Sequence, residues 1–256
     1  MKQAGQKNSG HGIVSHSQPG QYAWSDAPEA LICTLAFGDL INNLTRCLTL
    51  NGKIHAPTLL VASAALAGYA AQRAVIETII ASNDTARKDK IQMVTIKSGK
   101  TFCFGEPIDE ALLPLQPSEK LEKLWSLACG AAISAGLRRS ELPEISVLAA
   151  QANRAISEDY AHVASVSEDQ LPHLATRDAL KLVWPLALHC FDGKLSAKDL
   201  PNGAGMVPQR WRPVIAAVAV NNFMQQAKGF VPPLDALKLV METAIYASKL
   251  EAAALA

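Results

Sequence analysis

A glycine-containing loop that ends in two arginines is the part of this chain whose residue types best suit anion binding. Gly203 and Gly205 offer backbone N–H groups, and Arg210 and Arg212 supply guanidinium groups just before an expected helix. Exposed N–H groups, guanidinium forks and helix N-termini all bind phosphate or carboxylate. We therefore predict that the 201–213 loop is the place where a small anionic ligand would bind.

The spacing within this loop matches no established phosphate-binding motif. A P-loop requires Lys followed by Ser or Thr directly after its last glycine, whereas Gly205 is followed by Met206. Pro213 also removes one of the N–H donors of the helix that follows. A loop that only connects two helices is the competing interpretation, because many long loops have no other role.

Two histidines are candidates for acid–base chemistry. His162 follows Glu158 by four residues, which on a helix suits a carboxylate–histidine pair or half of a metal site. His173 is the nearest further ligand, but no complete set is evident, so a surface ion pair is the competing interpretation and no metal is predicted. His189 precedes Cys190, yet neighbouring helical residues face different directions, so His189 is not expected to activate that thiol.

The cysteines and the absence of common catalytic motifs point away from redox and cofactor chemistry. The five cysteines are widely spaced and form no C-x-x-C pair: Cys33, Cys47, Cys103, Cys129 and Cys190. This pattern predicts buried free thiols in a reducing compartment, and hence a cytoplasmic protein. The sequence also lacks the nucleophile-elbow, zinc-protease, dinucleotide-binding and deaminase motifs, so no cofactor is predicted.

Composition favours packed helices and disfavours binding to nucleic acids. Hydrophobic residues make up 49% of the chain, but aromatic residues only 5%, so most of the apolar content is Ala, Leu, Val and Ile. The formal net charge is +1 and no long basic stripe is present. Binding of nucleic acid through bulk electrostatics needs clustered Lys and Arg, and we therefore predict none.

One long apolar segment, Pro57–Ser82, is expected to form the central helix of the fold. It mixes many alanines with bulky aliphatic residues, and small residues allow neighbouring helices to approach closely. Its uninterrupted apolar run, Leu59–Ala71, is about 13 residues long, against the roughly 20 that a bilayer needs. A buried helix of a soluble protein is thus predicted, and not a membrane span.

The rest of the chain predicts a mainly α fold, a bundle or orthogonal array of about seven helices with one small β-hairpin. The other helices are expected near 26–50, 118–137, 143–165, 176–191, 213–228 and 233–256. The expected break before the central helix is Asn51-Gly52, read as a helix end. Pro185 is expected to kink or restart the 176–191 helix.

The hairpin is predicted over 92–104 with its turn at Ser98-Gly99, which would place Val94 opposite Cys103 and Ile96 opposite Thr101. An isolated two-stranded hairpin is only marginally stable in water. It must therefore pack on the helices or pair with its copy in a homodimer.

The expected organisation is a flexible arm at 1–24, a helical domain at 25–166 that contains the hairpin, and a helical subdomain at 167–256 packed on the same core. The favoured function is a non-catalytic homo-oligomeric scaffold or small-ligand-binding protein. The alternative is an enzyme whose small anionic or phosphorylated substrate is held by the 201–213 loop, with His162 or His189 as acid or base. A third hypothesis is an adaptor protein that uses the arm.

Overall fold

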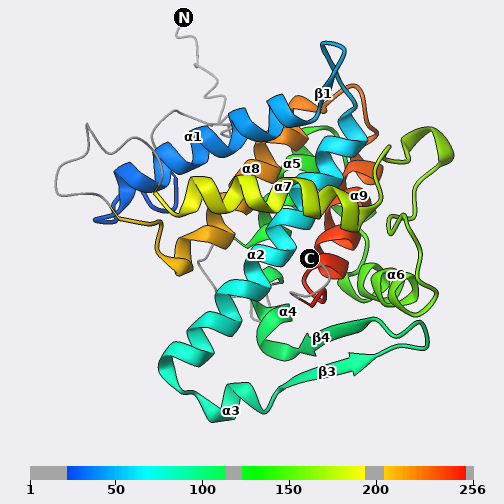
Figure 1. Cartoon of the computed structure of the whole chain (residues 1–256). Helices are drawn as coiled ribbons and strands as arrows, with labels where there is room; N and C mark the ends of the chain where they lie inside the picture. Colours follow the sequence, from blue (N-terminus) through cyan, green and yellow to red (C-terminus); the bar gives the residue numbers. More distant parts are fainter. Residues whose placement is uncertain (1–21, 114–122, 194–204, 252–256) are drawn as a thin grey trace, which may run out of the picture.

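The computed structural model describes residues 22–113, 123–193 and 205–251, which form a helical bundle with two small hairpins (Figure 1). The α-helices are α1 (Ala30–Cys47), α2 (Ala56–Ser82), α3 (Thr85–Lys88), α4 (Glu106–Leu112), α5 (Leu124–Ser134), α6 (Ile145–Ser157), α7 (Thr176–Phe191), α8 (Arg212–Gln226) and α9 (Pro233–Ala247). Short 3-10 turns lie at η1 (Arg139–Glu141), η2 (Glu168–Gln170) and η4 (Gln209–Trp211). The strands are β1 (Thr49–Leu50), β2 (Lys53–Ile54), β3 (Ile91–Thr95) and β4 (Thr101–Gly105). The predicted fold class, mainly α with a small hairpin, is confirmed.

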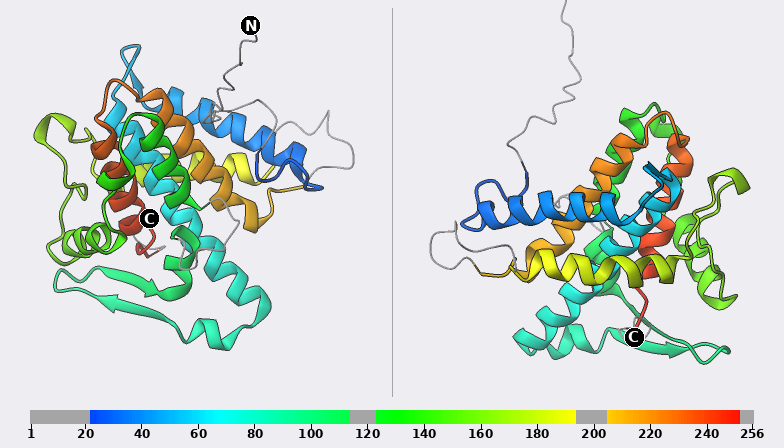
Figure 2. Two further views of the ribbon diagram at one scale, coloured as in Figure 1. Left: turned by 180° about the vertical axis from the view of Figure 1, so that it is seen from behind. Right: turned by 45° about the horizontal axis from the view of Figure 1, so that its top comes forward.

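Helix α2 is the central element, as its composition predicted. Every residue from Pro57 to Gln72 is buried, and α7, α8 and α9 all pack against this part of the helix (Figures 1 and 2). Pro57 lies in the first turn, where a missing N–H costs nothing, and Asn83 ends the helix with a left-handed backbone (φ 52°). The last turns of α2 project from the bundle toward α3 (Figure 1).

Helix α2 is also long and apolar enough to cross a membrane by length and composition, but 83% of its most apolar window is buried inside the protein. A helix enclosed by other helices in this way is typical of the core of a globular fold. Its apolar surface is used in helix packing.

Helix α2 approaches α9 very closely at Gly68. A Cβ atom built on Gly68 would lie 2.1 Å from the carbonyl oxygen of Ala244 in α9, so the two backbones touch. Side chains larger than hydrogen are excluded at this position unless the two helices move apart. Gly68 therefore sets the distance between the two helices.

The segment between α1 and α2 differs from the prediction. Asn51-Gly52 was expected to end a helix, but α1 ends at Cys47 and these two residues form the turn of the β1–β2 hairpin. Both have positive φ, 52° and 72°, as a type I′ turn requires. The Asn-Gly pair was read as a helix stop although it is also the strongest short signal for a hairpin.

The second hairpin exists where it was predicted, but its register was wrong by one residue. Val94 pairs with Phe102, and Thr95 pairs with Thr101. The cause is a three-residue loop in which the Ile96 N–H donates to the Lys100 carbonyl and Gly99 has a φ of 83°. A three-residue loop with glycine in the left-handed region is the next most common hairpin turn after the two-residue type that we had expected.

Several helix limits also differ. Helix α6 ends at Ser157, not near Ser165, because the chain leaves the helix at Asp159, which has a left-handed backbone (φ 56°). Helix α7 continues through Pro185 without a restart. The predicted 118–137 helix includes Lys123, but α5 begins at Leu124 because Lys123 has an extended backbone (φ −80°, ψ 153°). Residues 114–122 lie outside the described ranges.

Helices on both sides of the suggested boundary at residue 166 contribute to one hydrophobic core, in which α2 contacts α7, α8 and α9. The division into 25–166 and 167–256 stays a prediction. Residues 1–21 of the predicted arm lie outside the described residues. The next residues are anchored: Trp24 is fully buried, stacks on Tyr22 and donates its indole N–H to Thr34 Oγ1 at 3.1 Å.

Replacing Gly68 by alanine is expected to destabilise the protein by about 1–3 kcal/mol, because the new methyl group must push α9 away from α2. The matched control is Gly130→Ala in α5, where no described atom lies within 4 Å of the added Cβ. The control should stabilise by up to about 1 kcal/mol, since alanine is the better helix former. Denaturant unfolding of both variants measures the difference, and equal shifts would contradict the close contact.

Candidate functional site

Arg212, one of the two arginines predicted to bind an anion, is turned into the protein. Its side chain is 10% exposed, its Nε donates to the Val207 carbonyl at 3.1 Å, and its Nη2 lies 3.0 Å from Asp192 Oδ1. The guanidinium group also lies over the Phe191 ring, 5.6 Å from the centroid. Arg212 therefore holds together the two ends of the segment between α7 and α8.

Arg210 has different surroundings. Its side chain is 65% exposed and its Nη2 contacts both carboxylate oxygens of Glu29, at 2.9 and 3.1 Å. Gly205 is exposed, and Gly203 lies outside the described residues. Arg210, one of the residues predicted to bind an anion, lines a cavity.

This cavity, which we call the cation pocket, is bordered by Arg87, Lys123 and Arg210 and has a volume of about 270 Å³. The three cations come from α3, from the residue before α5 and from η4. The floor consists of small and aliphatic side chains of α2 (Ala67, Ala71 and Val75) and α8 (Pro213, Val214 and Ala217). Helix α4 forms one wall with Pro107 and Ala111. The pocket thus joins an apolar floor to a basic rim.

Among the described residues, the lining holds three cations and one carboxylate. The carboxylate is Glu110, which lies 3.5 Å from Arg87. Lys123 Nζ donates to the Leu113 carbonyl at 3.3 Å. Glu29, the partner of Arg210, is not part of the lining. Arg87 is 45% exposed, so it and Arg210 are open to a ligand that enters from solvent.

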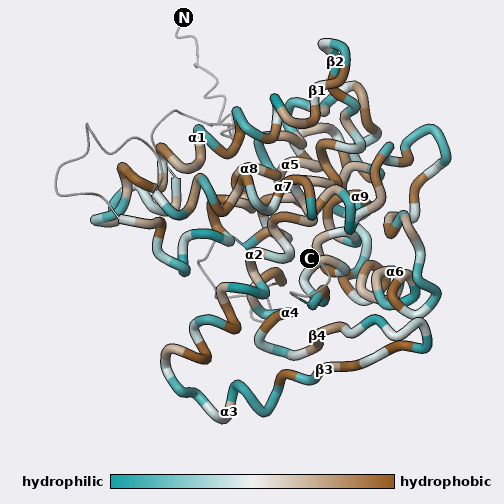
Figure 3. The backbone as a smooth tube through the Cα atoms, in the orientation of Figure 1, coloured by the Kyte–Doolittle hydropathy of each residue, from teal (hydrophilic) through white to brown (hydrophobic). Residues whose placement is uncertain are grey.

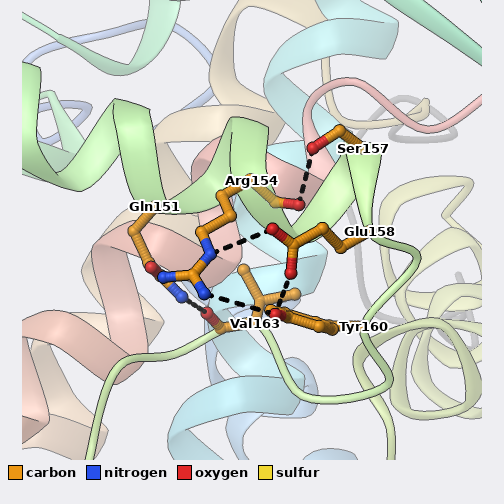
Figure 4. Close-up of polar contacts among 6 residues, drawn as sticks. All are labelled: Gln151, Arg154, Ser157, Glu158, Tyr160 and Val163. Atoms are coloured by element: carbon orange, nitrogen blue, oxygen red, sulfur yellow. Dashed lines mark hydrogen bonds and ion pairs between the residues drawn. The ribbon is translucent and has the colours of Figure 1, made fainter.

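The cluster around His162 is not the helical pair that was predicted. Because α6 ends at Ser157, Glu158 and His162 do not share a helix face. Glu158 accepts hydrogen bonds from Arg154 and Tyr160 (Figure 4), whereas Asp159 lies 2.6 Å from Lys100 in the hairpin turn. Figure 4 also shows Gln151 donating to the Val163 carbonyl, which fixes the chain next to His162.

Nδ1 of His162 is buried and has no hydrogen-bond partner among the described residues. His162 and His189 are both absent from the lining of the cation pocket. His189 is exposed in the last turn of α7. Within the described ranges, no three His, Cys, Asp or Glu side chains are placed to share a metal ion.

The cysteines are free thiols, and all except Cys47 are buried, as predicted. Burial raises the pKa of Cys129 to about 12 and that of Cys33 to about 11. Cys190 accepts a hydrogen bond from Asn43 Nδ2 at 3.4 Å, and burial raises its pKa as well. A thiol with a raised pKa is protonated at neutral pH and is a poor nucleophile.

A stacked histidine pair was missed by sequence analysis. The rings of His55, just before α2, and His173, just before α7, lie 3.6 Å apart at 7° to one another. Thr58 joins them, because its Oγ1 lies 2.8 Å from His55 Nδ1 and accepts the His173 backbone N–H at 2.8 Å. No local pattern could have revealed a pair whose members are so distant in the chain.

A second hollow of about 370 Å³ lies beside His55, with a mainly apolar lining that includes Leu59, Phe223 and Phe230. Burial, and then the neighbouring His173, lower the pKa of His55. The neutral form of the His55 ring is therefore favoured beside His173.

Stability is expected to fall on acidification because of His55. Its pKa is lowered in the folded state, so the unfolded chain takes up the proton first, near the ordinary value of 6.5. The stabilisation is therefore complete above about pH 7 and is lost as the pH falls through about 6.5 toward the lowered folded value. Urea unfolding of His55→Gln should show a flatter slope of stability against pH than the wild type between about pH 7 and 5.

The control for this measurement is His189→Gln, which removes an exposed histidine and should retain the wild-type slope. Other groups titrate in both proteins, so the difference between variants is the quantity of interest. Equal slopes for His55→Gln and the wild type would show that the stacked pair does not contribute.

Comparison of the chain with known proteins does not assign it to a family. No family model matches the chain, and no match to a curated protein or to a solved structure reaches significance. The cation pocket and its apolar floor are therefore the basis on which function is inferred.

Proposed function

We propose that this protein binds a small amphipathic anion in the cation pocket, without catalysing a reaction. The observation that carries this proposal is that Arg87, Lys123 and Arg210 come from three separate segments and border one cavity. Surface cations are usually dispersed, since like charges repel. A cluster of this kind over apolar residues suits a ligand with a carboxylate or phosphate at one end.

The shape of the pocket narrows the ligand class. Its volume of about 270 Å³ is at the small end for organic ligands, so a compact metabolite fits better than a nucleotide. The floor of Ala67, Ala71 and Ala217 offers apolar contact but no hydrogen-bonding side chain. The apolar part of the ligand would lie on these alanines, and its anionic group would face the rim.

The ion pairs of the rim orient its arginines and also limit their affinity. Arg210 is held by Glu29, and Arg87 lies 3.5 Å from Glu110. A bound anion would share each guanidinium group with its carboxylate, because a guanidinium has five N–H donors. The two ion pairs thus reduce the conformational entropy that the arginine side chains lose when a ligand binds. They also weaken the attraction of these arginines for the ligand.

The enzyme alternative is less well supported. It requires a histidine and the 201–213 loop to face the same cavity, and neither His162 nor His189 lines the cation pocket. Glu110 is the one carboxylate among the described residues of the lining, and Arg87 lies close to it. Binding without catalysis therefore accounts for more of the arrangement.

The proposal is tested by isothermal titration with phenyl phosphate and hexanoate, compared with phenol and hexanol. The anions should bind and the neutral analogues should bind at least tenfold more weakly, since a hydrogen bond to a charged group contributes about 1.5–3 kcal/mol. Arg210→Gln should weaken anion binding by roughly tenfold or more for the same reason. Inorganic phosphate should bind more weakly than phenyl phosphate, because it lacks an apolar part.

Arg154→Gln is the matched control. Arg154 is 61% exposed and paired with a glutamate, like Arg210, but it lies on α6 and does not line the pocket (Figure 4). Anion affinity should be unchanged in this variant. The proposal would be wrong if none of the anions bound, or if both variants lost affinity equally.

Removing the competing carboxylate should have the opposite effect. Glu29→Gln is expected to increase affinity for phenyl phosphate by a few fold, because Arg210 then loses its internal counter-charge. The increase should disappear in the Glu29→Gln, Arg210→Gln double variant. An increase that persisted there would assign the effect to another group.

A further inference from the structure

The outer edge of strand β3 has no neighbour within the described residues. Strand β4 is covered on both sides: β3 pairs with one edge, while at the other the Cys103 N–H donates to the Lys249 carbonyl at 2.7 Å and Phe102 pairs with Leu250. Figure 1 shows β4 next to the bundle and β3 at the rim of the molecule. An exposed strand edge is a ready template for another strand.

The backbone groups at this edge can be identified from the hairpin register. The Ile96 N–H donates to the Lys100 carbonyl, and in an antiparallel pair the hydrogen-bonding residues alternate along the strand. Gln92 and Val94 therefore face β4 with their peptide groups. Ile91, Met93 and Thr95 direct theirs to the open edge, which leaves three residues ready to pair.

Several large apolar side chains are exposed around this edge. Met93 is 53% exposed, and Ile80, on the projecting end of α2, is 73% exposed. A groove of about 720 Å³ separates the end of α2 from β3. Isoleucines of both segments line it, together with polar residues in and next to α3. Figure 3 shows hydrophobic residues along both of these segments. Natural proteins protect exposed edge strands with charge, proline or a covering element, so an apolar edge indicates a partner.

We propose that the partner is a second copy of this chain, whose β3 pairs antiparallel with β3 about a two-fold axis at Met93. In this register Met93 lies opposite its own copy and Ile91 opposite Thr95, so all three open residues pair with open residues. The result is a continuous four-stranded sheet. Each Met93 side chain lies beside the groove between β3 and α2, which the other copy helps to cover.

The charges that flank β3 favour this antiparallel arrangement, in which the start of one strand lies next to the end of the other. It brings Asp89, two residues before the paired segment, toward Lys97, two residues after it, on both sides of the axis. Neither has an ion-pair partner among the described residues.

The hairpin is held in position before any partner arrives. Lys100, at the turn of the hairpin, lies 2.6 Å from Asp159, which follows α6. Strand β4 is fixed by the backbone hydrogen bond from the Cys103 N–H to the Lys249 carbonyl. A strand that is already ordered loses little entropy when it pairs. The edge is thus suited to association without a folding step.

The dimer is tested by sedimentation equilibrium of the full chain over a concentration series from low micromolar to a few hundred micromolar. Wild-type protein should be in monomer–dimer equilibrium. Asp89→Lys and Lys97→Asp should each raise the dissociation constant roughly tenfold, because each change places like charges together twice in the dimer. The Asp89→Lys, Lys97→Asp double variant restores opposite charges and should return the constant to near the wild-type value.

Met93→Pro gives an independent test through the backbone. Proline removes one of the N–H groups at the open edge, whereas the ladder to β4 uses the even-numbered residues and is retained. This variant should be monomeric with an unchanged circular dichroism spectrum. A wild-type protein that stays monomeric throughout the series overturns the proposal, and so does a dimer that neither the charge reversals nor Met93→Pro weakens.

Discussion

The contact between α2 and α9 at Gly68 and Ala244 is the constraint on which the rest of the structure depends. It places two helix backbones in direct contact, so α2 can be covered by α7, α8 and α9 with little empty space. A helix buried on all sides must also satisfy its polar groups internally. Gln72 does so by donating to the Leu250 carbonyl at 2.9 Å, and the Ser63 hydroxyl donates to the Leu60 carbonyl.

The segment after α9 joins this core to both proposed sites. Lys249 is nearly buried, forms an ion pair with Asp109 of α4, and accepts the Cys103 N–H of β4 through its carbonyl. A buried ammonium group requires such a partner, since an isolated charge in the interior is very unfavourable. The same short segment thus positions α4, which forms a wall of the cation pocket, and covers one edge of β4, which leaves β3 as the open strand.

Much of the architecture was predictable because it depends on local patterns. The limits of α2, the presence of a turn at Gly99 and the mainly α class follow from apolar runs, prolines and glycines. The errors occurred where two turns share one signal. Asn51-Gly52 suits both a helix end and a hairpin. Ser98-Gly99 suits both a two-residue and a three-residue hairpin loop. In each case the packing of the flanking segments decides which turn forms.

By itself the sequence determined that this chain has a small-residue central helix, a hairpin that needs support, and arginines in the loop before α8. Only the tertiary structure decided what those arginines do. Arg212 is drawn inward by Asp192 and Val207, whereas Arg210 is held outward by Glu29 and borders a pocket with Arg87 and Lys123. The physical reason is that helix and turn formation depend on neighbouring residues, while the direction of a long charged side chain depends on counter-charges supplied by other parts of the chain.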